Sequence, residues 1–157
     1  MNKHSRIVVI GVGQDFRSDD AVGLVVARSI AEANLPGVRT VMGVADGTSM
    51  ISAWESADAA YVIDCMSSGD KPGTIRRFDA VTEEIPFAVF RNCSTHCFGI
   101  ASTVRLAEVL DQLPPRLVIY GIEGSDFAMG QDMSVEVNKA AHRIIHEITV
   151  EIESQAS

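Results

Sequence analysis

Three side chains, Asp20, Asp64 and His96, are of the types that metal chemistry or acid–base chemistry requires. Two carboxylates and one imidazole form an open ligand set for nickel, zinc or a similar divalent ion, with positions left for water or substrate. The same carboxylates can also transfer protons as a general acid and a general base. Spacing along the chain does not prove that the three meet, so the prediction depends on the elements that position them.

Asp20 follows a strand, a glycine turn and a polar loop. Residues Ile7–Ile10 are a β-branched run, typical of a strand that is covered on both faces of a parallel sheet. Apolar residues at helical spacing then predict a helix that begins near Ser18 or Asp19. Either residue can cap this helix, which leaves Asp20 without a structural task at the carboxyl end of the strand, where open α/β sheets bind their ligands. On this stretch alone, a cap and a functional site are equally well supported.

Asp64 and His96 are candidate site residues because both are expected at the same edge of the sheet as Asp20. Asp64 ends a predicted strand, residues 59–64, although a single Asp at a strand end is more often a turn cap. His96 lies just before a predicted helix, residues 100–110, whose N-terminal end discourages protonation and so favours a neutral ligand or base. A lone loop histidine is more often a surface residue. Because the topology sends all three side chains to one edge, we expect a site there.

The rest of the chain alternates strands and helices. Further strands are expected at residues 38–44 and within 113–122, and a last helix at about 134–152. Residues 74–78 alternate like an edge strand that runs antiparallel to the others. This order predicts an α/β fold with helices on both faces of a mainly parallel sheet. The tail, residues 151–157, loses the apolar pattern and is expected to fray.

Composition restricts the possible partners. A chain of 157 residues that is 46% hydrophobic fits a single domain, residues 1–157. Its net charge of −8 and pI near 4.9 argue against nucleic acid and against an anionic membrane surface. No apolar run is long enough for a membrane span, and the first residues lack a signal-peptide pattern, so a cytoplasmic protein is expected. Three cysteines, an odd number, fit reduced thiols.

Two other sites are less well supported. The Gly11–Gly13 turn suggests dinucleotide binding, but Phe16 stands where a third glycine is needed and the loop carboxylates would repel a phosphate. Cys93, His96 and Cys97 lack the fourth ligand of a structural zinc site, so small buried cysteines are the simpler interpretation. Asp46, after the second predicted strand, fits a turn better than a helix cap or a wall of the site.

The order of several motifs resembles the hydrogenase maturation endopeptidases, which trim the C-terminus of the large subunit of nickel-iron hydrogenases. The segment from Gly11 to Gly23 is similar to the family signature G-x-G-N-x-x-x-x-D-[DE]-x-x-G, with Gln14 in place of the usual Asn. Four further motifs follow in the expected order: Asp46–Thr48, Val62–Asp64, Pro72–Thr74 and Ser94–His96. The resemblance therefore extends over nearly the whole chain.

The resemblance implies a three-layer α/β/α fold with a twisted five-stranded, mostly parallel sheet and one antiparallel edge strand. It implies that Asp20, Asp64 and His96 contact a metal, with Asp20 and Asp64 as the catalytic carboxylates. The expected metal is nickel that arrives inside the substrate, so the free enzyme need not hold any. The expected partner is the precursor of a nickel-iron hydrogenase large subunit, and the enzyme is expected to be a monomer.

Alternatives remain at this point. The metal can polarise the scissile carbonyl while Asp20 or Asp64 activates water, or the carboxylates can act as an acid–base pair with nickel serving only for recognition. A non-proteolytic metal-sensing or docking module on the same fold is the alternative function. Its mark would be a missing ligand, and all three positions are filled. A nucleotide-binding domain is the third option.

Overall fold

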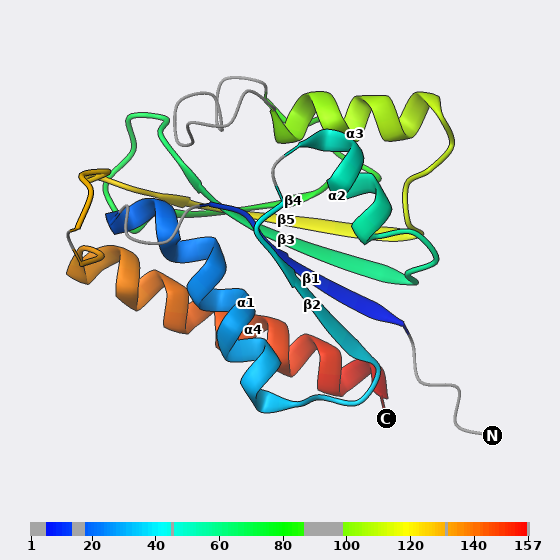
Figure 1. The fold of residues 1–157 in the computed structure, drawn as a ribbon, viewed down its shortest axis with the longest axis horizontal. Helices are drawn as coiled ribbons and strands as arrows, with labels where there is room; N and C mark the ends of the chain where they lie inside the picture. Colours follow the sequence, from blue (N-terminus) through cyan, green and yellow to red (C-terminus); the bar gives the residue numbers. More distant parts are fainter. Residues whose placement is uncertain (1–5, 14–17, 45, 87–98, 131, 157) are drawn as a thin grey trace.

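The computed structural model describes residues 6–13, 18–44, 46–86, 99–130 and 132–156. These residues form a five-stranded sheet with the strand order β2–β1–β3–β5–β4 (Figure 1). The strands are β1 (Ile7–Gly11), β2 (Val38–Met42), β3 (Ala59–Met66), β4 (Ile75–Asp79) and β5 (Arg116–Glu123). Four of them run parallel, and β4 pairs antiparallel with β5 at one edge. The predicted mostly parallel sheet with an antiparallel edge strand is confirmed.

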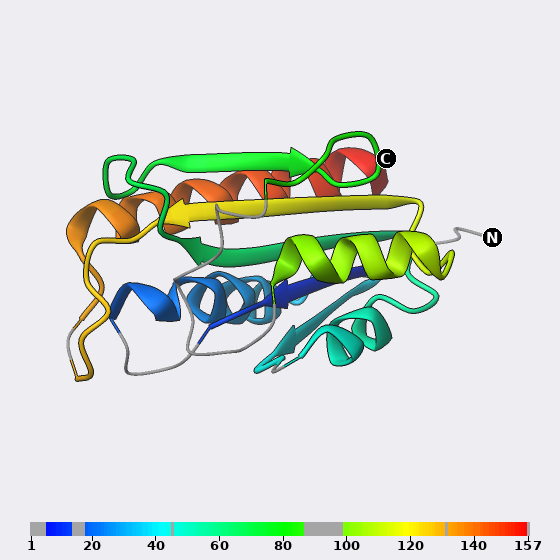
Figure 2. The ribbon, with the colours of Figure 1, turned by 90° about the horizontal axis from the view of Figure 1, so that it is seen from above.

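Helices cover both faces of this sheet. On one face α1 (Val22–Ala33) packs against α4 (Val135–Ala156), and on the other α2 (Gly47–Ala53) packs against α3 (Ile100–Val109). Figure 2 shows the strands side by side, with β2 and β4 at the two edges. The three-layer fold is therefore confirmed. Among the described helices, none combines the length and the apolar composition that a membrane span requires.

The central strands β1 and β3 end at different heights. Gly11, the last residue of β1, is in register with Ile63, and the Val12 N–H donates to the Ile63 carbonyl oxygen at 2.9 Å. β3 continues to Met66, two residues further than predicted, so Asp64 lies where its neighbour β1 has already ended. In the sheet, β2 lies on one side of β1 and β3 lies on the other, so the strand order reverses at β1. Such a reversal of strand order is where open α/β sheets place ligands.

The start of α1 differs from the prediction. Residues Ser18–Ala21 form a short 3-10 helix, η1, and α1 begins only at Val22. The N-cap position is Ala21, which offers no side-chain acceptor. The Ser18 hydroxyl donates instead to the Asp132 carbonyl oxygen at 2.9 Å, and Asp19 also binds a distant segment. The prediction that Ser18 or Asp19 caps α1 was therefore wrong, because tertiary contacts engage both side chains.

Two further local predictions are corrected. α4 continues to Ala156 rather than fraying after residue 151, since Ile152 is buried and Glu151 pairs with Arg77 at 3.3 Å and with Arg116. Asp46, for which a turn was favoured, is the N-cap of α2 and accepts the Ser49 N–H at 2.7 Å.

Candidate active site

Two glycines let the start of α1 press against the sheet. A Cβ on Gly11 would collide with the carbonyl oxygen of Gly23, the second residue of α1. A Cβ on Gly23 would in turn collide with the carbonyl oxygens of Val12, just after β1, and of Ile63, within β3. Close approach of this kind requires glycine. These glycines therefore serve helix–sheet packing.

A third glycine, Gly13, fits against the residue that carries the predicted chemistry. Its φ angle is 132°, a conformation that L side chains rarely adopt. A Cβ there would collide with the carbonyl oxygen of Asp20 and lie 3.8 Å from its Oδ1. The turn after β1 thus fixes where η1 runs, and η1 contacts β3. In this way the glycine turn delivers Asp20 to the edge that bears Asp64.

Asp20 and Asp64 form a buried pair of carboxylates. Asp20 is 0% exposed and Asp64 is 4% exposed. Burial raises the pKa of Asp64 well above its usual range, the charge of Asp20 raises it further, and the hydrogen bond from the Cys65 N–H at 2.8 Å only partly opposes this rise. Two carboxylates that are close together and shielded from water resist being ionised at the same time. The pair is therefore suited to exchange a proton or to bind a cation.

His96, the third predicted ligand, lies outside the described residues, together with Cys93 and Cys97. The helix expected after His96 is present as α3, which begins at Ile100. Within the described ranges, no three His, Cys, Asp or Glu side chains are grouped in a way that could hold a metal ion. The structure thus brings Asp20 and Asp64 together, and the three-ligand metal site stays a prediction.

Asp19 has a role in the site that the sequence analysis missed. Its side chain is 0% exposed and accepts the backbone N–H groups of Ser125 at 2.8 Å, Asp126 at 3.0 Å and Ser134 at 2.8 Å. Burial is the largest single influence and acts to raise the pKa of Asp19, but these hydrogen bonds together hold that pKa below its ordinary value. No local pattern announces this role, because the partners are 106 to 115 residues away in the sequence.

A second buried carboxylate at the same edge was also missed. Glu123 ends β5 and is 3% exposed, whereas the strand expected within residues 113–122 stops one residue before it. It accepts the backbone N–H groups of Ser68 at 2.9 Å and Gly69 at 3.1 Å, and the Ser68 hydroxyl at 2.8 Å. Glu123 therefore holds the connection between β3 and β4.

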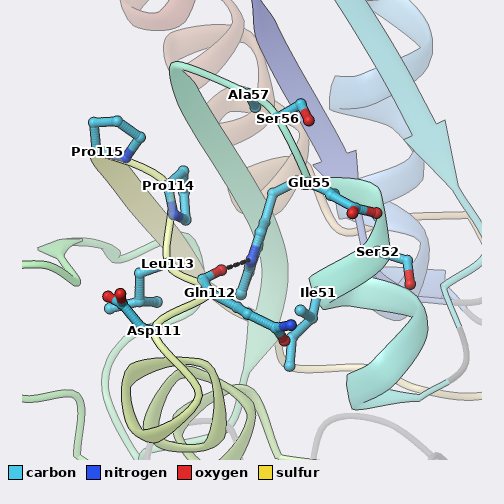
Figure 3. A pocket seen from close by; sticks show the side chains of 11 residues that line it. Ile51, Ser52, Glu55, Ser56, Ala57, Asp111, Gln112, Leu113, Pro114 and Pro115 are labelled. Atoms are coloured by element: carbon cyan, nitrogen blue, oxygen red, sulfur yellow. Dashed lines mark hydrogen bonds between the residues drawn. The ribbon is translucent and has the colours of Figure 1, made fainter.

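A pocket of about 410 Å³ lies at the other end of the strands, where β3 and β5 begin (Figure 3). Residues 55–57, just before β3, and 113–115, just before β5, contribute to its lining. Trp54 Nε1 donates to the Gln112 carbonyl oxygen at 2.8 Å beside it. Neither Asp20 nor Asp64 lines this pocket. The carboxylate pair, rather than this hollow, is therefore the candidate active site.

Comparisons with known proteins agree on one description. A family model described as hydrogenase maturation protease matches residues 25–151. The hydrogenase expression/formation protein HupD of Rhodobacter capsulatus is 27% identical over 124 residues, which cover 77% of this chain and 58% of HupD. The chain thus spans less than two thirds of the length of this relative.

Two solved structures from Escherichia coli share the fold. The hydrogenase maturating endopeptidase HybD has a TM-score of 0.73 at 16% identity, and an endopeptidase solved in solution has a TM-score of 0.79 at 20% identity. Each comparison covers 96% of this chain and 93% of the other. None of these matches supports the non-proteolytic alternative. The family expected from the order of the motifs is confirmed, and the chain belongs to the hydrogenase maturation protease family.

Proposed function

We propose that the protein is an endopeptidase that removes the C-terminal extension from the nickel-loaded precursor of a nickel-iron hydrogenase large subunit. The proposal rests on one observation above all. In a chain of the hydrogenase maturation protease family, two carboxylates, Asp20 and Asp64, are buried together where β1 ends beside β3. Such a pair has the acid–base capacity that peptide hydrolysis needs.

Nickel enters this proposal as part of the substrate. Asp20 and Asp64 contact the nickel held by the precursor, and His96 is the third contact. Burial and the charge of Asp20 both raise the pKa of Asp64, and a divalent ion would oppose this rise because a nearby positive charge stabilises both ionised carboxylates. Carboxylate and imidazole ligands both suit a borderline ion such as nickel. In this scheme, only a precursor that has received its nickel is cleaved.

The reaction is the addition of one water molecule across a peptide bond. The water oxygen bonds to the scissile carbonyl carbon, and one water proton passes to an ionised carboxylate of the pair. The carbon–nitrogen bond then breaks, and the departing nitrogen takes that proton from the carboxyl group of the pair, which returns to its ionised form. The mature subunit gains a new terminal carboxylic acid, which ionises in water, and the released peptide gains an amine. Either the metal polarises the carbonyl during this sequence, or the carboxylates act alone and nickel serves recognition. Removing nickel from a precursor that is already bound separates the two schemes.

The test is the intact mass of a nickel-loaded precursor after incubation with purified protein. We expect the wild type to release a single C-terminal peptide, and Asp20→Asn and Asp64→Asn to release none. The matched control is Asp111→Asn, an exposed aspartate at the other end of the strands whose left-handed φ of 54° asparagine tolerates. It should cleave like the wild type.

Each result of this assay bears on a separate claim. Full activity of either carboxylate variant refutes the role of that residue. An unchanged mass with the wild type, on a precursor confirmed to carry nickel, rejects the proposed function.

A further inference from the structure

Asp19 links η1 to a distant part of the sequence, through Ser125, Asp126 and Ser134. Besides the three backbone amides, the hydroxyl of Ser134 donates to both of its oxygens, at 3.0 and 3.1 Å, and the hydroxyl of Ser125 donates to Oδ2 at 3.3 Å. The backbone joins in, because the Asp19 N–H donates to the Asp126 carbonyl oxygen at 2.9 Å. Both the side chain and the main chain of Asp19 are thus committed to this segment.

The same connection also packs against the neighbour of Asp64. A Cβ on Gly124 would lie 2.6 Å from the Sγ of Cys65 and 3.1 Å from the Cβ of Asp19. The Gly124 N–H donates to the Met66 carbonyl oxygen at 3.0 Å. The chain after β5 therefore touches the residue next to each carboxylate of the pair, and it leaves no spare space there.

We infer that Asp19 is a positioning residue for the cleavage reaction. By accepting five donors from Ser125, Asp126 and Ser134, it holds η1 in place and so keeps the carboxylate of Asp20 beside Asp64. This inference rests on the proposed function of the pair. A cap of α1 would explain an acidic residue here, but the N-cap position of α1 is Ala21, and the oxygens of Asp19 accept donors from Ser125, Asp126 and Ser134 instead.

The consequence of weakening this link is a loss of turnover rather than of substrate binding. Asp19→Asn keeps the shape of the side chain but replaces one acceptor by an NH₂ group that faces N–H donors, so part of the set of hydrogen bonds is lost. Misplacing a reacting group by about 1 Å can cost on the order of 100-fold in rate. We expect the kcat of precursor cleavage to fall about 10- to 100-fold in Asp19→Asn, with KM unchanged. Ser134→Ala removes only the hydroxyl bonds and should give a smaller fall in kcat.

Glu123→Gln is the matched control. Glu123 is also buried at this edge and also accepts backbone N–H groups, but it holds Ser68 and Gly69 instead of η1. We expect Glu123→Gln to keep the wild-type kcat even where its unfolding temperature drops. A fall in kcat that follows stability in all three variants would show that Asp19 has only a general folding role, which overturns the inference.

Amide hydrogen exchange supplies a readout that needs no substrate. Residues 18–21 should exchange faster in both Asp19→Asn and Ser134→Ala, although Ser134 is 115 residues from Asp19. Unchanged exchange of these amides in both variants, or a wild-type kcat in folded Asp19→Asn, overturns the inference. If the wild type cleaves no precursor, the proposed function fails, and the exchange data still decide whether Asp19 holds η1.

Discussion

The stability of Asp64→Asn relative to the wild type should increase as the pH rises. Asp64 is 4% exposed, and its pKa in the folded protein lies well above the ordinary value because burial and the charge of Asp20 both disfavour ionisation. An unfolded chain releases the same proton near pH 4. Between these two pKa values, the folded protein holds one proton more than the unfolded chain, so the wild type loses stability with rising pH. Asparagine does not titrate and avoids this loss.

The size of the effect follows from counting that one proton. A difference of one bound proton changes the equilibrium constant of folding about tenfold for each pH unit in that window. Below about pH 4 both forms of the wild type are protonated at this position, and the difference between variant and wild type no longer depends on pH. The hydrogen bond from the Cys65 N–H to Oδ1 can persist in Asp64→Asn, because the asparagine side chain retains an oxygen acceptor.

Urea unfolding of both proteins at a series of pH values, with a chelator present, measures this difference. Asp19→Asn is an internal control of the opposite sign. Burial acts to raise the pKa of Asp19, but the amides of Ser125, Ser134 and Asp126 lower it overall, so the ionised side chain contributes stability above about pH 4. That contribution is lost as the pH falls through the lowered pKa. Asp19→Asn should therefore approach the wild type in stability towards acid pH.

Parallel stability curves for Asp64→Asn and the wild type across neutral and mildly acidic pH would refute the reasoning. They would mean that the charge of Asp64 is solvated or paired in the folded protein. The Asp20→Asn variant separates the two causes, because burial still raises the pKa of Asp64 there while the charge of Asp20 is gone. The loss of stability with rising pH should then extend over a narrower pH range than in the wild type.

Three further predictions concern the elements around the site. Gly13→Ala places a Cβ against the Asp20 carbonyl oxygen at a φ of 132°. This variant should have a free energy of unfolding that is lower by about 1–3 kcal/mol, and it should cleave the precursor more slowly. An unchanged urea midpoint and an unchanged activity would contradict this prediction. Asp46→Ala removes the acceptor for the Ser49 N–H and should lower the unfolding temperature, whereas Asp46→Asn, which keeps an acceptor, should restore it in the same thermal melt. Glu151→Gln weakens the contacts with Arg77 and Arg116; it should cost less than about 1 kcal/mol and speed amide exchange only in the last turns of α4, which mass spectrometry of its peptides would detect.

The strand pattern and the two carboxylates were predictable because their causes are local or topological. The β-branched run Ile7–Ile10 predicted β1, a strand was expected at residues 59–64, where β3 lies, and alternation at residues 74–78 predicted the antiparallel strand β4. Asp20 and Asp64 could be placed together because the carboxyl ends of parallel strands lie at one edge of a sheet. Because β1 and β3 are neighbours in the sheet, η1, which follows β1, contacts β3.

The missed features depend on partners that are distant in the sequence. Capping rules consider only the few residues around a helix start, so they assigned Asp19 to α1 and had no way to find Ser125 or Ser134. The tail, residues 151–157, was expected to fray because its apolar pattern ends there. The pattern could not show that Glu151 pairs with Arg77 and Arg116, which belong to other elements. His96 lies outside the described residues, so its place in the site is still a prediction.

The long sequence separation between Asp19 and its partners also orders events in folding. The unit of β1, α1 and β2 consists of neighbours in the sequence, and contacts between such neighbours form at a low cost in loop closure. The carboxylate of Asp19 meets its donors only when the chain following β5 reaches η1, 106 to 115 residues later. During synthesis on the ribosome, the geometry around Asp20 therefore cannot be complete until Ser134 has emerged. A nascent chain shorter than this contains both carboxylates but lacks the contacts that align them.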